Sequence, residues 1–452
     1  MKTILVLEDN DERIAGFSSA VRELGKDWHM RIWRDAPTMI VECASSLDDA
    51  RLISLDHDLL AQAGADRDPG NGLEVAEYLA SYIPLCPVII HTSNADRAWS
   101  MHNEFRFAGW TVDRVEPLGD DWIPRFWLPK VCELLTRFPR SEFFQRPVDH
   151  SGRMHRALLS LEGLAIGDAL GEMLAYRHVE TARIIERGLP SGTWLHTDDT
   201  EMALSIVEVL QLYGHVHQDA LSRRFAWRYK CDPDRGYGSM TRAQFHEIAR
   251  GGAWRQCAVS AFNGQGSMGN GGAMRVAPIG AYFADDLSRV AKEARASALV
   301  THTHGEGIAG AIAVGIAAAM AWRLREEHGT TTASRVFDSV LEHTPEGKVL
   351  SGLVIASQIP SVMPVEEVAK TLGNGFLVTA PDTVPFAIWC AAHHLDNFVE
   401  ALALTISSGG DCDTNAAIVG GIVALAVGFE GIPDDWKQKK EKLPIAVEAG
   451  CS

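Results

Sequence analysis

Two short stretches of the chain gather carboxylate and hydroxyl oxygens directly before an apolar helical pattern. The first is HTDDTEM at residues 196–202, and the second is GGDCDTN at residues 409–415. Side chains one or two positions apart do not face each other on a helix, so these groups converge only where the backbone leaves helical geometry, at an N-cap and first turn. The free N–H groups and the helix dipole at that point also favour negative oxygen.

Helix capping and metal binding both explain such clusters. Asp and Thr are common N-caps, but one carboxylate with one hydroxyl is enough to cap a helix. The surplus carboxylates repel one another unless a cation neutralises them, which favours a metal site over capping alone. An all-oxygen set without His or Cys suits Mg²⁺, Mn²⁺ or Ca²⁺ rather than zinc. If both clusters face one cleft, they can hold two ions roughly 3.5–4 Å apart, which orients substrate hydroxyls and activates a water.

The elements that would position these residues fall into two regions of different periodicity. Residues 1–138 alternate short apolar runs with amphipathic segments, which indicates a doubly wound parallel α/β sheet with any site at the C-terminal ends of its strands. The apolar runs predict five strands at 4–7, 31–33, 52–55, 88–91 and 111–115. The amphipathic segments predict five helices at 12–24, 38–45, 70–82, 95–108 and 127–137.

The second region has a different pattern. Residues 139–153 carry two prolines, several charges and no period, which is typical of a linker. Residues 154–452 consist of long Ala- and Gly-rich helical stretches with almost no strand-like alternation, which predicts a compact all-α domain. The predicted helices are 155–175, 197–213, 217–230, 241–250, 286–299, 305–327, 331–343, 347–357, 365–372, 383–395, 396–406 and 413–428.

The composition limits the class of function. With 452 residues and 46% apolar content the chain can bury two domain cores, because single cores rarely grow beyond ~250–300 residues. The formal charge of −17 and the lack of a long basic run argue against general nucleic-acid binding. The eight cysteines include no Cys-x-x-Cys pair, so we expect a reducing cytoplasm rather than a zinc site or a disulfide framework.

We also expect neither a signal peptide nor membrane association. The first residues, MKTILVLEDN, become acidic after a few apolar positions. The apolar stretches 308–322 and 416–428 are shorter than the ~20 residues that a bilayer requires, and we expect them to form buried helices. Nothing in the sequence indicates an oligomeric state.

Six motifs occur in the order found in the ADP-ribosylglycohydrolase family, which includes dinitrogenase-reductase-activating glycohydrolase. They are GDALG at 167–171, HTDDTEM at 196–202, GSMGNGGAMRVAPIG at 266–280, THTH at 301–304, DTVPFAIW at 382–389 and GGDCDTNAAIVGGIVALAVGFEGIP at 409–433. The chain resembles this family over residues 154–436. The resemblance implies an all-α fold and hydrolysis of the N- or O-glycosidic bond at C1″ of an ADP-ribosyl group.

The resemblance further implies a centre of two Mg²⁺ ions, with Mn²⁺ as the alternative metal. Its ligands would be Thr197, Asp198, Asp199, Asp411, Asp413 and Thr414. The metals would grip the distal ribose hydroxyls, and a metal-positioned water would attack the anomeric carbon. Asp198 and Asp413 are therefore also predicted to be catalytic.

One position departs from the family pattern. Many members carry a Glu that approaches the water and the ribose, whereas this chain reads GDALGEMLAY at 167–176 and has Ala175 at that place. Either Glu172, one helical turn earlier, takes over the role, or a metal-bound aspartate assists the water. We predict Glu172 as the third catalytic residue.

Several further residues are predicted to contact the substrate. The Gly-rich loop 266–272 lets backbone N–H groups approach an anion closely, although an ordinary flexible turn also explains it. His302 and His304 precede a helix, where a His is either a structural hydrogen-bonder or, by the family pattern, a residue that lines the cleft. The predicted substrate contacts are Asp168, Gly269, Asn270, Gly271, Arg275, His302 and His304.

The strands predicted in residues 1–138 end in polar residues that would meet at one crevice. This pocket would contain Glu8, Asp9, Asp56, His57, Asp58, His91 and Thr92. The arrangement is similar to response-regulator receiver domains, and that similarity implies a Mg²⁺ pocket with Asp56 as the phosphoacceptor. Receivers carry a Lys-Pro after the fifth strand where this chain has Glu116-Pro117, and the missing cation disfavours phosphoacceptance.

His57 and His91 resemble instead a receiver-derived group suggested to process cyclic phosphates, in which two histidines act as acid and base on a phosphodiester. An inert docking or dimerisation domain is one alternative, and signalling by phosphorylation is another. For the whole chain, the first hypothesis is a Mg²⁺-dependent hydrolase acting on ADP-ribosylated protein, nucleic acid or an ADP-ribose derivative. The second is a non-catalytic ADP-ribose-binding sensor with a receiver-like signalling or docking domain.

Overall fold

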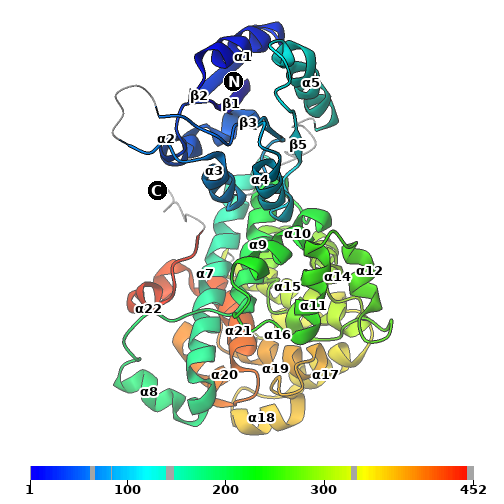
Figure 1. The fold of residues 1–452 in the computed structure, drawn as a ribbon. Helices are drawn as coiled ribbons and strands as arrows, with labels where there is room; N and C mark the ends of the chain where they lie inside the picture. Colours follow the sequence, from blue (N-terminus) through cyan, green and yellow to red (C-terminus); the bar gives the residue numbers. More distant parts are fainter. Residues whose placement is uncertain (1, 62–66, 83, 139–146, 327–332, 445–452) are drawn as a thin grey trace. The chain divides into compact units, whose positions relative to one another are not determined.

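The computed structural model describes residues 2–61, 67–82, 84–138, 147–326 and 333–444. The chain divides into two compact units, Met1–Gln145 and Arg146–Ser452. The first unit mixes strands with helices, and the second is helical (Figure 1).

The amino-terminal unit is built on one sheet of five parallel strands, in the order β2-β1-β3-β4-β5. The strands are β1 (Lys2–Leu7), β2 (Trp28–Trp33), β3 (Ala50–Leu55), β4 (Val88–Ile90) and β5 (Val112–Arg114). The order places β1 and β3 side by side at the centre of the sheet, and in doubly wound folds the carboxyl ends of such strands form the binding crevice. The predicted fold class is confirmed.

Helices alternate with these strands along the chain. They are α1 (Asp11–Glu23), α2 (Ala36–Glu42), α3 (Gly72–Ala80), α4 (Ala95–Phe107) and α5 (Leu128–Arg137), with a 3₁₀ turn η1 (Cys43–Asp49) and a single π-helical turn η2 (Ile123–Trp127). Aliphatic strand residues pack against Phe17 and Trp127, which are fully buried. The sheet and this aromatic core fix the polar residues that follow β1, β3 and β4.

The described residues of the second unit form the twelve predicted helices and four shorter ones. The helices are α7 (His150–Leu174), α8 (Thr181–Arg187), α9 (Asp198–Tyr213), α10 (Gln218–Cys231), α11 (Ser239–Ala249), α12 (Trp254–Ser260), α13 (Ala277–Tyr282), α14 (Leu287–Leu299), α15 (Gly305–Glu326), α16 (Ala333–His343), α17 (Lys348–Gln358), α18 (Val365–Leu372), α19 (Ala380–His393), α20 (Phe398–Ser407), α21 (Cys412–Val427) and α22 (Asp434–Lys439). Three short 3₁₀ turns, η3 (Ala175–Glu180), η4 (Asn270–Gly272) and η5 (Phe429–Gly431), join them. The all-α class predicted for this region is confirmed.

The helix α7 begins inside the segment predicted as a linker. It starts at His150, so the last four residues of the segment 139–153 are helical. Residues 139–146 of that segment lie outside the described residues. The boundary between the two compact units falls after Gln145.

Helices α7 and α21 pack closely along their lengths (Figure 1). Gly163, Gly167 and Gly171 are spaced by four residues and form one stripe on α7. A Cβ atom at Gly167 would lie 2.0 Å from the carbonyl oxygen of Ala416, and one at Gly171 would lie 2.7 Å from the Cα atom of Asp413. Only glycine permits this approach, which brings the end of α7 beside the start of α21.

One helix among the described residues, α15 (Gly305–Glu326), is long and apolar enough to cross a membrane by length and composition. It is longer than the apolar stretch 308–322 because its ends carry glycine and charged residues. The protein itself buries 89% of its apolar window. The helix therefore serves as a core element of the helical unit, as predicted for a buried helix.

Candidate metal centre and active site

The first acidic motif forms the N-terminus of α9. Thr197 is the N-cap, and its hydroxyl accepts a hydrogen bond from the backbone N–H of Asp199 at 3.4 Å. The backbone N–H of Asp198 donates to the carbonyl oxygen of Arg235 at 2.6 Å. This hydrogen bond ties the start of α9 to the segment that carries Arg235.

Asp168 of α7 stabilises this turn through hydrogen bonds. Its carboxylate accepts hydrogen bonds from the backbone N–H and the hydroxyl of Thr197, and from the backbone N–H and the hydroxyl of Thr200, at 2.5–3.1 Å. Asp168 is fully buried, and these donors occupy the lone pairs of both oxygens. The hydrogen bonds of Asp168 thus hold the turn at the start of α9 in place, which leaves its carboxylate no oxygen for the substrate contact predicted from the sequence.

The second acidic motif forms the N-terminus of α21, with Asp411 as the N-cap residue. Gly375 has a φ of +84°, and a Cβ atom there would lie 2.6 Å from the Cβ atom of Asp411, so only glycine fits beside this turn. The side-chain amide of Asn270, in the Gly-rich loop, donates to the carboxylate of Asp411 at 2.6 Å and to the hydroxyl of Thr383 at 3.0 Å. Asn270 therefore ties the Gly-rich loop to the acidic motif, a role that its predicted substrate contact did not include.

The fold brings the two acidic motifs together. The hydroxyl of Thr414 donates to the Oδ2 atom of Asp199 at 3.4 Å, across 215 residues of sequence. The Asp413 charge acts on Asp168, Asp198 and Asp199, so its carboxylate faces the first motif. The two motifs that carry the six predicted ligand residues therefore lie next to each other.

Burial and crowding make this pocket costly for negative charge. Burial, followed by the charges of Asp168 and Asp413, raises the pKa of Asp198 and of Asp199 well above the usual range. Burial, followed by the charge of Asp413, raises the pKa of Asp411 to about 8. Burial also raises the pKa of Asp168 to about 6, although a hydrogen bond from Thr200 opposes the rise. A divalent cation would relieve this repulsion.

The residues present fit such a cation. The Oδ1 atom of Asp199 is buried and has no hydrogen-bond partner, as expected of an oxygen that awaits a ligand. Within the described ranges, no Lys, Arg or His forms an ion pair with Asp168, Asp198, Asp199, Asp411 or Asp413. The donor atoms are oxygens only, which matches Mg²⁺ or Mn²⁺. In the described part of the chain, no three of these carboxylates bring their ligand atoms within 4.8 Å of one another.

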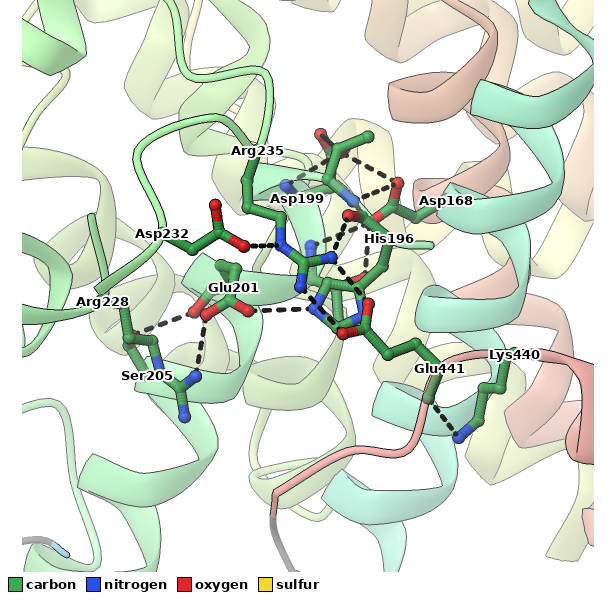
Figure 2. A network of polar contacts seen from close by, with 12 residues as sticks. Asp168, His196, Asp199, Glu201, Ser205, Arg228, Asp232, Arg235, Lys440 and Glu441 are labelled. Atoms are coloured by element: carbon green, nitrogen blue, oxygen red, sulfur yellow. Dashed lines mark hydrogen bonds and ion pairs between the residues drawn. The ribbon is translucent and has the colours of Figure 1, made fainter. Parts of the chain in front are cut away.

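A network of ion pairs surrounds His196, the residue that precedes Thr197 in the first motif (Figure 2). The ring of His196 lies between Glu201, at 3.0 Å, and Glu441, at 3.2 Å. Arg235 donates to both oxygens of Glu441, at 2.6 and 2.8 Å, and to the carbonyl oxygen of His196 at 2.9 Å. Arg228 pairs with Glu201 at 2.8 Å.

No functional role of these supporting residues was predicted from the sequence. His196 and Glu201 lie inside the quoted HTDDTEM motif, so their position was the available signal. Arg235 and Glu441 are separated by 206 residues, and only the fold shows that they meet. Their effect is to fix the turn that carries Thr197, Asp198 and Asp199.

Glu172 lies in the last turn of α7 and is exposed. Burial of its carboxyl and then the charge of Asp413 raise the pKa of Glu172. Ala175 follows as the C-cap of α7, at the start of the 3₁₀ turn η3. The structure thus places a solvent-accessible carboxyl within the influence of the Asp413 charge, one turn before Ala175, and the catalytic role of Glu172 stays a prediction.

The Gly-rich loop packs over the ring of His302. A Cβ atom at Gly269 or at Gly271 would lie 3.2 Å from the Nε2 atom of His302. Burial, followed by the charge of Arg275, lowers the pKa of His302 to about 3, so the ring is neutral. Its Nδ1 atom faces the hydroxyl of Thr301 at 2.7 Å. The loop and His302 therefore form one wall of the site.

Arg275 and His304 were predicted to contact the substrate, but both form hydrogen bonds within the protein. The guanidinium of Arg275 is fully buried and donates to the carbonyl oxygen of Ser297 at 2.8 Å and to the hydroxyl of Thr301 at 3.0 Å. A side chain without exposed surface supports the loop rather than the substrate. The Nδ1 atom of His304 accepts from the backbone N–H of Glu306 at 3.1 Å, so His304 caps the first turn of α15.

The amino-terminal unit forms the second predicted pocket at the carboxyl ends of its strands. Glu8, Asp56 and His91 meet there, and all three are buried. His57 instead turns its Nδ1 atom to Asp58 at 2.7 Å. Thr92 is buried next to His91 and accepts from the backbone N–H of Asn94.

Asp9 and Glu116 complete the outer part of this region. The carboxylate of Asp9 accepts from the backbone N–H of Leu60 at 2.6 Å. Burial raises the pKa of Asp9. Glu116 pairs with Arg114 at 3.7 Å, so the position after β5 carries an anion where receivers carry a lysine.

The chain consists of two units. The first is a receiver-like α/β unit, and the second is a helical unit in which two helix N-termini bring acidic residues together. The ADP-ribosylglycohydrolase family matches residues 149–449, and the chain belongs to that family. The family described as cyclic-phosphate processing receiver domain matches residues 4–107.

Curated relatives agree with this assignment. The chain is 31% identical to ADP-ribosylhydrolase ARH3 of Mus musculus over 62% of this chain and 86% of that protein. It is 32% identical to ADP-ribosylhydrolase ARH3 of Bos taurus over 62% of this chain and 87% of that protein. It is 25% identical to ADP-ribosyl-[dinitrogen reductase] glycohydrolase of Rhodospirillum rubrum over 63% of this chain and 90% of that protein.

Proposed function

We propose that the helical unit hydrolyses the glycosidic bond at C1″ of an ADP-ribosyl group, using two Mg²⁺ ions. The ions would be held by Thr197, Asp198, Asp199, Asp411, Asp413 and Thr414. The contact between Thr414 and Asp199 carries the proposal, because it joins two acidic helix N-termini whose aspartates form no ion pair with any described Lys, Arg or His. The names of the curated relatives support the same reaction class.

The residues of the helical unit would have separate roles in this reaction. Bound in the pocket, Mg²⁺ would supply Lewis-acid polarisation and lower the pKa of a bound water. Asp168 and the network around Arg235 would keep the aspartates in one geometry. Glu172, exposed beside Asp413, would accept the proton of the attacking water, and its pKa, raised by burial and by Asp413, suits a general base. The Gly-rich loop would approach the pyrophosphate through its backbone N–H groups.

The sequence predicts a reducing cytoplasm as the compartment, and we keep this as part of the proposal. The seven described cysteines are free thiols. Free thiols support a reducing compartment.

For the amino-terminal unit we propose phosphodiester chemistry on cyclic phosphates. The family match over residues 4–107 is the observation that favours it. His57 is 7% exposed and His91 is fully buried, so His57 would meet a substrate first and His91 would act within the pocket.

The reaction of the helical unit is tested by release of free ADP-ribose. Arginine-, serine- and nucleic-acid-linked ADP-ribosyl substrates are incubated with the full-length protein in Mg²⁺ or in EDTA, and the products are identified by mass spectrometry. Free ADP-ribose is expected from at least one linkage, in Mg²⁺ only. The identity of that linkage names the leaving group.

Matched variants separate the enzyme from the alternative, an ADP-ribose-binding sensor. Asp413→Asn is expected to abolish release, whereas Asp435→Asn, an exposed aspartate in α22, is expected to retain it. Tight binding of the substrates without release from any of them, unchanged in Asp413→Asn, would leave only the sensor.

A further inference from the structure

Three consecutive apolar residues are exposed in the loop between α18 and α19 of the helical unit (Figure 1). The exposed fractions of Phe376, Leu377 and Val378 are 80%, 67% and 58%. Single exposed apolar residues are common on protein surfaces, but a run of three neighbouring ones is rare unless it contributes to binding. The loop of residues 374–379 is called the rim loop below.

The carboxyl end of the rim loop is bound to the Gly-rich loop. Thr379 and Gly269 form an antiparallel bridge between the two segments. Next to this bridge, the backbone N–H of Ala380 donates to the carbonyl oxygen of Met268 at 2.9 Å. The rim loop therefore ends beside the backbone N–H groups that we propose to approach the pyrophosphate of the substrate.

The amino end of the rim loop is bound to the second acidic motif. The carbonyl oxygen of Asn374 accepts from the backbone N–H of Asp411 at 3.1 Å and from the side-chain amide of Asn415 at 2.6 Å. The side-chain amide of Asn374 donates to the carbonyl oxygen of Ser408 at 3.0 Å. Because Asp411 is a proposed metal ligand, the rim loop connects the proposed position of the distal ribose with that of the pyrophosphate.

Contacts within the rim loop fix its backbone in a strained conformation. The backbone N–H of Leu377 donates to the Oδ2 atom of Asp382 at 2.8 Å, and that of Val378 donates to the carbonyl oxygen of Gly375 at 2.7 Å. Val378 has a φ of +54°, a left-handed conformation that β-branched residues rarely adopt. Strain of this kind, held in place by the surrounding structure, is concentrated at functional sites. The backbone is thus fixed in advance, while the apolar side chains face solvent.

The connections of the rim loop limit what its apolar side chains can contact. The distal ribose and the pyrophosphate are polar, so their proposed partners are the acidic motifs and the Gly-rich loop. An adenine base is flat and can stack on one ring, but the side chains of consecutive residues point in different directions. A polypeptide surface can follow all three of them. The run of three therefore favours a polypeptide over a base as the partner.

The charges around the rim loop disfavour a nucleic acid. Residues 373–380 contain no Lys or Arg, and the formal charge of the chain is −17. Asp382 and Asp411, whose hydrogen bonds hold the loop, are acidic. Proteins that stack bases on aromatic side chains combine them with a positively charged groove that neutralises the phosphates. A phosphate backbone would find no such cation in the rim loop.

We propose that the rim loop is the docking surface for a polypeptide that carries the ADP-ribosyl group, with Phe376, Leu377 and Val378 against an apolar patch of that polypeptide. The inference rests on the proposed hydrolase function and extends it to a substrate class, ADP-ribosylated protein. Binding energy from such a remote contact raises kcat/KM for a protein substrate. A single ADP-ribosylated amino acid has no polypeptide surface and gains nothing from the contact.

The test compares two substrates with the same linkage, an ADP-ribosylated protein and the corresponding ADP-ribosyl amino acid. Arginine and serine linkages are both tried with the full-length protein in Mg²⁺, and the linkage that releases ADP-ribose is used. The measured quantity is the ratio of kcat/KM for the protein substrate to kcat/KM for the amino acid. Phe376→Ser and Leu377→Ser are each expected to lower this ratio about tenfold, because truncating an apolar anchor weakens a protein contact by at least that factor.

Val362→Ser is the matched control and is expected to keep the ratio. Val362 is 88% exposed but precedes α18, so that helix, about 12 Å long, separates it from the rim loop. Thermal unfolding of each variant is measured first, and Leu377→Ser serves alone if Phe376→Ser does not fold. If no substrate releases ADP-ribose, the proposed function fails. The ratio of the two calorimetric affinities then replaces the kinetic ratio, with the same expected tenfold change.

Three results would overturn the docking proposal. The first is an unchanged ratio in the rim-loop variants, including an equal loss for both substrates, which would place the contact on the ADP-ribosyl group itself. An unchanged ratio together with a dimer that Phe376→Ser dissociates would assign the surface to a second copy of the chain. The second is release from, or binding of, the nucleic-acid-linked substrate alone, or of none. The third is a loss in Val362→Ser as large as in the rim-loop variants.

Discussion

Both units collect carboxylates in a buried pocket, but they balance the resulting charge in different ways. In the amino-terminal pocket Arg13 contacts both Asp56 and Glu8, and His91 faces Glu8. In the helical pocket the contacts to the aspartates come from hydroxyls, backbone N–H groups and the amide of Asn270. Among the described residues no side-chain cation pairs with those aspartates.

The pKa values of the carboxyl groups also differ between the two pockets. Burial alone would raise the pKa of Glu8, but the hydrogen bond and charge of His91 hold it below the usual range. In the helical pocket burial and neighbouring aspartates raise the pKa of Asp411 to about 8. Arg13 therefore partly neutralises the amino-terminal carboxylates, whereas no ion pair to the aspartates of the helical pocket occurs among the described residues. We propose that divalent ions balance the charge of the helical pocket, whereas Arg13 contacts both carboxylates of the amino-terminal pocket.

The largest effect is expected from removing a carboxylate of the helical pocket. Asp198→Asn should lower the rate of ADP-ribose release by about a thousandfold, because a lost metal–oxygen interaction removes several kcal/mol of charge stabilisation. The rate is measured by mass spectrometry at saturating substrate. Asp435→Asn is the control, and a loss of less than tenfold in Asp198→Asn would place the chemistry elsewhere.

The second prediction tests whether Glu172 takes the role of the family glutamate, whose position is occupied by Ala175. Glu172→Gln should reduce the turnover rate by about a hundredfold, as expected when a general base is lost. Mg²⁺ affinity, measured by calorimetry, should stay within about twofold because Glu172 is not one of the proposed ligands. An unchanged turnover rate would assign the base to a metal-bound aspartate instead.

A smaller effect is expected from the support behind the helical pocket. Glu441→Gln weakens the paired contacts to Arg235 and should lower Mg²⁺ affinity about tenfold, the usual scale for an outer contact of a metal ligand. Calorimetric titration with Mg²⁺ gives the affinity. Glu430→Gln, an exposed glutamate in η5 outside this network, is the matched control. Equal affinities in both variants would show that the network serves folding alone.

The smallest effect compares the two pockets by stability in EDTA at neutral pH. The raised pKa of Asp411 means that its ionised form destabilises the fold above the unfolded pKa of 3.8, so Asp411→Asn should stabilise the protein by about 1 kcal/mol. The lowered pKa of Glu8 means that its ionised form stabilises the fold above the unfolded pKa of 4.5, so Glu8→Gln should destabilise it by a similar amount. Denaturant unfolding measures both. Shifts of the same sign would contradict the comparison.

Much of the fold follows from local sequence periodicity. The structure places α18 at Val365–Leu372, the residues predicted, because its apolar and charged residues alternate with a clear helical period. The helices α8 and α13 were not predicted, since six or seven residues make at most two turns and give no readable period. Strand β4 ends at Ile90, one residue before the predicted end, which leaves His91 in the crevice.

Some residues of the candidate site could also be predicted from local sequence, and others could not. The proposed ligands lie in two local motifs, so their types and spacing are visible in the sequence. The partners that fix them are distant, as in the pair of Arg235 and Glu441, and local spacing does not encode such contacts. Proximity in sequence also misleads, because Arg275 follows the Gly-rich loop but points into the core.

The central claim is that the helical pocket holds two divalent ions, and electron paramagnetic resonance of bound Mn²⁺ tests it most directly. The account predicts an exchange-coupled Mn²⁺ pair in the full-length protein, and its disappearance in Asp413→Asn. Only magnetically isolated Mn²⁺, or no bound Mn²⁺, in the full-length protein would contradict it.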